Sequence, residues 1–125
     1  MSTLKVTTLQ DTAGANSSTS AEIYSGRAKA WVNFNGQGTV SVRSDYNVNT
    51  VGDNGTGQYT VNYSTAIGNA NYSAVAGGSR NGTTASDNSY HGFYNLASGS
   101  IQCCSAGPVN AFTDPVFFAL AVFST

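Results

Sequence analysis

The sequence predicts an all-β protein, an antiparallel β-sandwich built from hairpins, with a short extended N-terminal arm. Three observations support this fold class. Short segments of alternating apolar and polar residues recur along the chain of 125 residues, as in half-buried strands. Turn residues such as Asn-Gly separate these segments at regular intervals. No segment shows the sustained periodicity of a long helix, and the length is that of one domain.

The N-terminal residues 1–20 are predicted to form the arm. Leu4 and Val6 alternate as in a short strand, and residues 11–20 have the composition of a linker. A single helical turn is expected near Ala21–Tyr24, with Ser20 as its cap. The globular β domain is therefore assigned to residues 21–125.

The first strands are expected at 27–34 and 39–43. Ala30, Val32 and Phe34 face one way, and Trp31 faces the other. Because paired residues share a face, a loop at 35–37 is favoured, which pairs Val32 with Val40 and Ala30 with Val42. Trp31 is either a core or interface contact or an exposed platform, and the pattern alone leaves both open.

The next hairpin is predicted from Asn54-Gly55, a strong two-residue turn signal. That turn pairs Thr50 with Tyr59, Val48 with Val61, and Tyr46 with Tyr63. The opposite face then carries uncharged polar residues, and it is either a solvated sheet surface or a glycan contact. These residues are Asn47, Asn49, Thr60 and Asn62.

The C-terminal half predicts a strand in 69–78, a loop at 79–89, a strand pair at 90–96 and 100–106, and a final strand in 114–125. Both faces of the final strand are apolar. Such a strand is normally buried on both sides. We therefore expect it to be central in its sheet, with a partner chain helping to cover it.

Low charge narrows the function classes. Only 9% of the residues are charged and the formal net charge is −1, whereas typical soluble proteins have about 25% charged residues. A nucleic-acid partner is not expected, because it would require a basic face. Membrane insertion is not expected either, because no apolar run approaches the ~20 residues of a membrane-spanning helix.

Groups that could perform catalysis are sparse, so we expect no enzyme, no metal and no cofactor. His91 is the single histidine, which is too few for a metal site within one chain. The carboxylates have ordinary turn or capping positions, and Asp45 with Asp87 is the remaining option for a glycosidase pair. Cys103 and Cys104 are adjacent, too close for an ordinary disulfide, so reduced thiols are expected.

The segment 79–94 is the predicted ligand contact. Aromatic rings beside polar side chains suit carbohydrate, because sugar C–H faces stack on rings while sugar hydroxyls bind polar groups. The candidate ligand-binding residues are Arg80, Asp87, Tyr90, His91 and Tyr94.

Three segments carry a resemblance to a known class of proteins. "RAKAWVNFNG" (27–36), "DNGTGQYTVNY" (53–63) and "NANYS" (69–73) resemble the C-terminal modules of bacteriophage tail-fibre and related virion appendage proteins, particularly those of marine and cyanobacterial phages. The similarity covers roughly residues 4–78. It includes no catalytic signature, and no receptor-binding residue transfers by position.

The resemblance implies a homotrimeric, β-rich appendage of the virion, made in the cytoplasm of the bacterial host, that contacts the host cell surface and often its polysaccharide. Other virion proteins would be its neighbours, and residues 1–20 would be the remnant of a three-fold stalk. Two alternatives remain open at this point. One is a purely structural decoration or baseplate protein, and the other is a polysaccharide depolymerase.

Overall fold

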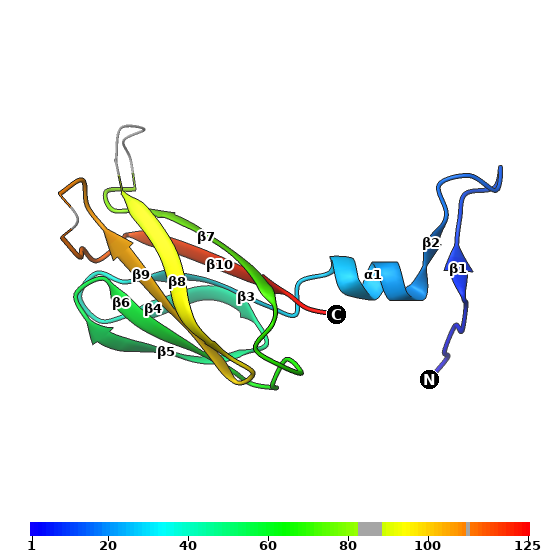
Figure 1. Ribbon diagram of the computed structural model, residues 1–125, viewed down its shortest axis with the longest axis horizontal. Coiled ribbons are helices and arrows are strands. Elements are labelled where there is room, and N and C mark those ends of the chain that lie inside the picture. The colour runs from blue at the N-terminus through cyan, green and yellow to red at the C-terminus, as the bar shows by residue number, and fades with distance from the viewer. Residues whose placement is uncertain (83–88, 110) are drawn as a thin grey trace.

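The computed structural model describes residues 1–82, 89–109 and 111–125 and confirms the all-β sandwich. Two four-stranded antiparallel sheets pack face to face (Figure 1). Sheet I has the order β4 (Ser41–Tyr46), β3 (Ala30–Asn35), β10 (Phe117–Phe123), β7 (Ser73–Ser79). Sheet II has the order β5 (Val48–Gly55), β6 (Gln58–Tyr63), β9 (Ser100–Ala106), β8 (Tyr90–Ala97).

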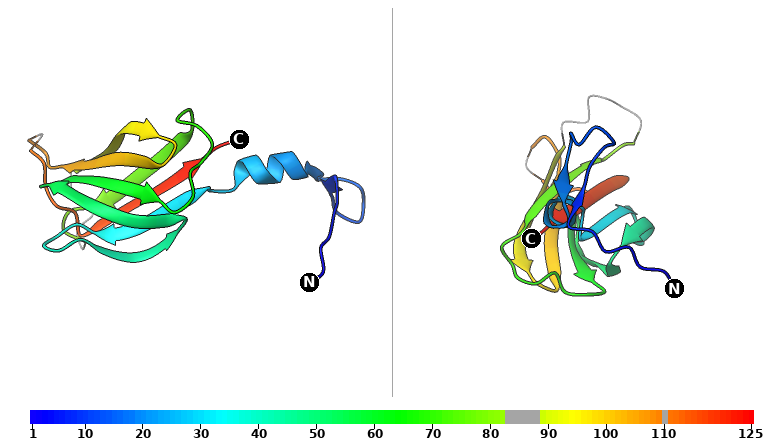
Figure 2. Two further views of the ribbon diagram at one scale, coloured as in Figure 1. Left: turned by 90° about the horizontal axis from the view of Figure 1, so that it is seen from below. Right: turned by 90° about the vertical axis from the view of Figure 1, so that its right-hand side faces the viewer.

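An arm extends from one end of the sandwich (Figure 2). It contains the paired strands β1 (Thr8–Leu9) and β2 (Ser18–Thr19), followed by the helix α1 (Ser20–Gly26). The predicted helical turn is therefore present, but its cap is Thr19 rather than Ser20. Thr19 and Glu22 form a capping box, in which each side chain binds the main-chain N–H of the other. This reciprocal pairing satisfies two N–H groups of the first turn.

The core lies between the sheets and is centred on aromatic rings. Phe34 of β3 packs edge-on against Tyr59 of β6, with ring centroids 5.0 Å apart, and stacks on Phe118 of β10 at 5.2 Å. The inward side chains of β3, β6, β9 and β10 alternate with outward ones, as the period of two requires. The buried apolar residues are Ala30, Val32, Phe34, Tyr59, Val61, Tyr63, Ile67, Tyr72, Ile101, Cys103, Phe118, Leu120 and Val122.

The register predicted for the first hairpin is wrong. Phe34 pairs with Val42 and Val32 pairs with Asp45, and the register shifts between Asn33 and Phe34. A β-bulge, which leaves Arg43 without a cross-strand partner, explains the shift. The loop spans 36–40 because Gly36 does not pair with β4. Its N–H instead donates to the Pro115 carbonyl at 2.8 Å.

The register predicted for the second hairpin is also wrong, because the turn lies at Thr56-Gly57 and not at Asn54-Gly55. Val51 pairs with Val61, and Asp53 pairs with Tyr59. Gly57 has a φ of +65° and is packed so closely that a Cβ there would lie 2.4 Å from the Ser105 carbonyl oxygen. Only glycine fits this position, so a tertiary contact decides where the chain turns.

The strand predictions for the C-terminal half are confirmed in outline. The strands β8 and β9 pair with each other, and β10 lies between β3 and β7 at the centre of sheet I. The side chains of Phe118, Leu120 and Val122 are buried against sheet II. On the outward side of β10, Phe117 and Ala119 are exposed, and Ala121 and Phe123 are half-buried. The expected help from a partner chain stays a prediction.

Candidate functional site

The outer face of sheet II carries a network of uncharged polar side chains. The Thr60 Oγ1 atom accepts a hydrogen bond from Asn54 Nδ2 at 2.7 Å and one from Gln102 Nε2 at 3.4 Å. Asn95 Nδ2 in turn donates to Gln102 Oε1 at 2.6 Å. These bonds connect side chains from all four strands of the sheet. They hold the amides and the hydroxyl in fixed positions at the surface.

Tyr94 extends this network with an aromatic ring. Gly52, Thr60, Gln102 and Tyr94 are cross-strand partners in one row, so their side chains share a face. Gly52 has no side chain, and this leaves the row open at its β5 end. An aromatic ring beside fixed amide and hydroxyl groups can stack on an apolar surface while the polar groups bind hydroxyls. Uncharged polyols such as sugars fit this chemistry.

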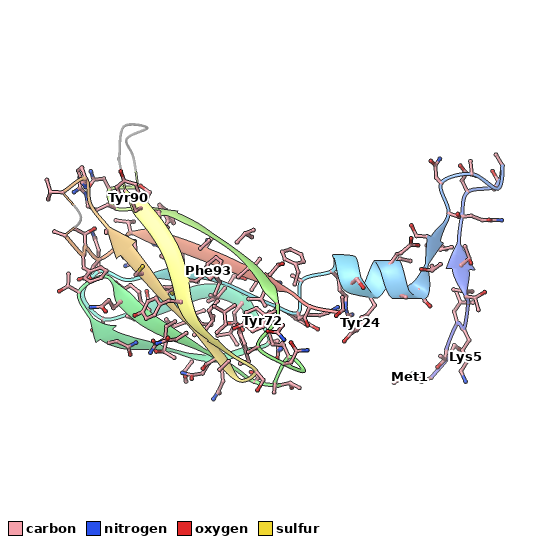
Figure 3. All side chains as sticks on the ribbon, viewed as in Figure 1. Met1, Lys5, Tyr24, Tyr72, Tyr90 and Phe93 are labelled. Carbon is pink, nitrogen blue, oxygen red and sulfur yellow. The ribbon has the colours of Figure 1, made fainter. Side chains whose placement is uncertain are left out.

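The structure separates the predicted ligand-binding residues into two groups. Tyr90 (Figure 3) is 65% exposed, and the strand register places it on the same outer face of sheet II as Tyr94. His91 faces the opposite way, and its ring lies edge-on against Phe118 with centroids 5.5 Å apart. Arg80 follows β7, and its carbonyl accepts a hydrogen bond from Gln37 Nε2 at 3.3 Å. Asp87 lies outside the described residues.

The outer face of sheet I is more apolar, although Asn33, Ser44, Ser73 and Ser79 also lie on it. Tyr46, Trp31, Ala121 and Val75 form one cross-strand row across all four strands. Trp31 is 38% exposed and Val75 is 58% exposed. Of the two alternatives left open for Trp31, a buried core contact is therefore excluded. This side chain is part of an exposed apolar surface.

A charged group stands at one end of this apolar face. The Arg43 guanidinium lies over the Phe117 ring, 4.3 Å from its centroid, and donates to Asn33 Oδ1 at 3.4 Å. Arg43 is the bulged residue of β4, so the bulge directs its side chain to this face. The apolar face of sheet I is defined by Trp31, Tyr46, Val75, Phe117, Ala119, Ala121 and Phe123.

A third feature is a cavity of about 390 Å³ at the arm end of the sandwich. Tyr24 of α1 forms one wall of this cavity (Figure 3). Arg27 and Lys29, from the segment that joins α1 to β3, bring two positive charges to it. The other lining residues are Tyr46, Asn47, Thr65, Ala66, Ile67, Gly68, Ser124 and Thr125.

Three carboxylates have structural roles, as the sequence predicts. Asp11 Oδ1 accepts the N–H groups of Ala13 and Ala15 in the arm. Asp53 Oδ1 accepts the Gly55 N–H at 2.9 Å in the β5–β6 turn. Asp114 Oδ1 accepts hydrogen bonds from the Tyr59 hydroxyl at 2.8 Å and from the Gly57 N–H at 2.7 Å. The proposed pair of Asp45 with Asp87 stays a prediction, because Asp87 is not described.

The thiols are free, as expected for neighbouring residues of one strand. Burial raises the pKa of the Cys103 thiol to about 12. Within residues 1–82, 89–109 and 111–125, no cluster of three side chains of the types that bind metals occurs. No helix in the same ranges has the length and apolar character needed to cross a bilayer.

Comparison with protein-family models, with curated proteins and with solved structures finds no match to this chain.

Proposed function

We propose that this protein is a tail-fibre-like appendage module of a phage virion, homotrimeric, that contacts a polysaccharide of the host cell surface. The proposal combines the sequence resemblance with one structural observation. The outer face of sheet II presents Tyr94 in the same cross-strand row as the hydrogen-bonded Gln102 and Thr60. We assign this row as the glycan contact.

The row fits an uncharged sugar in two ways. The Tyr94 ring offers a stacking surface for the C–H face of a pyranose, and the amide of Gln102 offers both a donor and an acceptor to its hydroxyls. The hydrogen bonds among Asn95, Gln102 and Thr60 already restrict these side chains. Less conformational entropy is therefore lost when a glycan binds. Each contact of this size is weak, and several copies on one particle strengthen the attachment.

The apolar face of sheet I supports association with further copies of this chain. It extends over four strands, so its projected area is roughly 400 Å², from a strand spacing of ~4.8 Å and a rise of ~3.4 Å per residue. A standard interface buries about 800 Å² per partner. The sheet face alone therefore supplies about half of the needed area.

The arm can supply the remainder of that interface. Leu4, Leu9 and Ile23 are exposed, and α1 has no buried residue. A helix of 7 residues is marginal by itself, since isolated helices shorter than about 12–15 residues are unstable in water. Packing of the arm on a second copy would stabilise this helix and cover its apolar side chains. The second copy is the partner that we propose, because it offers the same largely apolar surface.

The glycan contact is tested by binding of the protein to purified host-surface polysaccharides, with matched variants. We expect Tyr94→Ala to weaken binding about tenfold, since a stacked ring contributes about 1 kcal/mol beyond its buried area. Gln102→Ala should weaken it as well. Gln37→Ala, which removes an exposed glutamine from loop 36–40, should leave it unchanged. Equal effects of the two glutamine variants would overturn the assignment of the row.

Oligomerisation is tested by light scattering of the full chain. A homotrimer gives a mass close to three times 12.9 kDa, and Trp31→Lys should lower it by placing a charge in the apolar face. A monomer at all concentrations would refute the self-association. A trimer that binds no glycan would favour the alternative of a purely structural virion protein. The apolar face of sheet I is the observation that supports this alternative. Release of reducing sugar from a bound glycan would favour the depolymerase.

A further inference from the structure

We infer that the cavity between α1 and the arm end of the sandwich binds a sugar residue that carries a carboxylate, such as a uronic acid. This inference rests on the proposed glycan contact for the class of ligand. It adds a second subsite, of different charge and at a different place from the row on sheet II.

The cavity is lined by two positively charged side chains. Lys29 is only 8% exposed, and its ammonium lies 3.3 Å from the centroid of the Tyr24 ring. The Arg27 guanidinium lies over the same ring at 5.2 Å. The described residues that line the cavity include no aspartate and no glutamate. Arg27 and Lys29 therefore bring two cations to one half-open pocket, and no acidic side chain is among its described lining residues.

The ammonium group of Lys29 has N–H groups left for a ligand. Its ammonium donates to the Tyr24 carbonyl, which occupies one of its three N–H groups and leaves two for a ligand. Loss of solvent, and secondarily the nearby charge of Arg27, lower the pKa of Lys29. Both causes disfavour the charged form of the side chain. An anion bound between the two residues would reverse this penalty.

The side chain of Asn47 holds two walls of the cavity in place. Asn47 has a φ of +56°, and its Nδ2 atom donates to the carbonyls of Lys29 at 3.0 Å and Thr65 at 2.9 Å. Its Oδ1 atom accepts the Thr65 N–H at 2.8 Å. One side chain thus fixes the main chain on two walls of the cavity. Binding to a preformed site costs less than binding to one that must be ordered.

The volume of the cavity and its lining residues indicate which kind of molecule bears the bound anionic group. The volume of about 390 Å³ lies within the range of about 300–1,000 Å³ that is typical of small-molecule sites. Tyr46 adds an exposed aromatic wall, and Thr65 and Ser124 add hydroxyls. The planar fork of Arg27 matches a planar carboxylate. A pyranose with a carboxylate uses the charge, the ring and the hydroxyls of this cavity together.

The test uses one pair of ligands that differ only in charge, tetragalacturonate and its fully methyl-esterified form. The full chain is titrated with each by calorimetry at low ionic strength. We expect the acid to bind about tenfold or more tightly than the ester, because a hydrogen bond to a charged group is worth about a tenfold change in affinity. Arg27→Gln should remove most of this preference. Arg43→Gln removes the same charge from the outer face of sheet I, and should change the affinity less than about twofold.

Each other outcome rejects a defined part of the inference. Equal binding of acid and ester, or equal loss in the two arginine variants, would show that no specific anion site exists. Inorganic phosphate that binds as tightly as the acid would overturn the choice of a carboxylate. Lys29→Gln gives a second variant of the cavity, with a thermal melt to confirm that it folds.

The same titration separates this inference from the proposed function. If Tyr94→Ala abolishes binding of the acid and Arg27→Gln does not, the acidic sugar binds at sheet II and the cavity is not its site. If Arg27→Gln abolishes binding and the row on sheet II binds no glycan, the cavity site stands and the assignment of the row is wrong.

Discussion

Substitution of Asp114 is expected to weaken the sandwich at the end opposite the arm. The Asp114 carboxylate accepts hydrogen bonds from the buried Tyr59 hydroxyl and from the Gly57 N–H. It thereby joins the β5–β6 turn to the segment that leads into β10. Asp114→Ala removes the acceptor for both donors, while Asp114→Asn keeps an oxygen in the same place without the charge.

The size of the effect follows from these two bonds. A hydrogen bond to a charged group contributes about 1.5–3 kcal/mol, so two such bonds give an upper limit of about 6 kcal/mol. Two features reduce that value. The Gly36 carbonyl, 3.3 Å from the Tyr59 hydroxyl, offers a substitute acceptor. Asp114 is only half-buried, so water can enter the space that the missing carboxylate leaves. We therefore expect Asp114→Ala to lower the free energy of unfolding by about 2–4 kcal/mol, and Asp114→Asn by about 1–2 kcal/mol.

Urea unfolding, followed by circular dichroism at one protein concentration, measures both values. Since m for a small domain is about 1–3 kcal/mol per molar urea, the alanine variant should shift the midpoint by about 1–2 M. Tyr59→Phe completes a double-mutant cycle with Asp114→Asn, and the two changes should be clearly non-additive. A loss below about 0.5 kcal/mol for Asp114→Ala, or additive effects in the cycle, would refute this account.

Three further results are expected. Gly36→Ala should destabilise the fold by about 2 kcal/mol or more, since its Cβ would lie 2.3 Å from the Tyr59 hydroxyl oxygen. The control Gly99→Ala meets no atom within 4 Å and should be nearly neutral. Similar unfolding midpoints for the two variants would contradict this prediction. A thiol reagent at pH 8 should modify the half-buried Cys104 and not the buried Cys103, with both reacting in urea; mass spectrometry identifies the labelled residue. Alkaline pH should destabilise the protein, because the folded state raises the pKa of Cys103 to about 12, while an unfolded thiol ionises near pH 8.5. The contribution of Cys103 is complete below about pH 8.5 and is lost as the pH rises towards 12, at up to about 1.4 kcal/mol per pH unit; unfolding free energies measured from pH 8 to 11 that do not fall would disprove it.

Local alternation was enough to predict which residues face the core. Ala30, Val32 and Phe34 are buried, and Trp31 between them is exposed, as the period of two requires. The same argument placed Thr60 and Asn62 on a polar outer face. It wrongly placed Tyr46 and Thr50 on the inward side, since Tyr46 is 48% exposed and Thr50 pairs with Asn62. The correct predictions depend only on the geometry of one extended strand, so no knowledge of distant residues was needed.

The registers of both hairpins depend on contacts that a local pattern does not contain. Gly36 is fixed by the Pro115 carbonyl, and Gly57 is fixed by Asp114 and Ser105. Asn-Gly at 54–55 is a strong turn signal, but the close packing at Gly57 overrides it. A sequence pattern shows which residues favour a turn. It does not show whether a contact with a residue far along the chain will move that turn.

The candidate sites also depend on contacts between residues that are far apart in the sequence. The partners of Thr60 in the polar network, Gln102 and Asn95, come from strands that follow it by a long stretch of chain. Alternation in 100–106 indicates that Gln102 and Cys104 share a face, but not that this face adjoins Thr60. The cavity is still less accessible to sequence reasoning, because its walls come from α1, the β4–β5 connection, loop 64–68 and the last residues described.

Both chain termini lie beyond the same end of the sandwich (Figure 1). The turns at 36–40 and 56–57 lie at the other end. In loop 36–40 the segment 37–39 is exposed, and a Cβ at Gly38 would meet no atom within 4 Å. Exposed loop tips of this kind accept inserted sequence most readily. A peptide grafted between Gln37 and Thr39 would therefore be displayed far from any tag or surface attachment at the termini, which makes this fold a natural scaffold for presenting foreign epitopes.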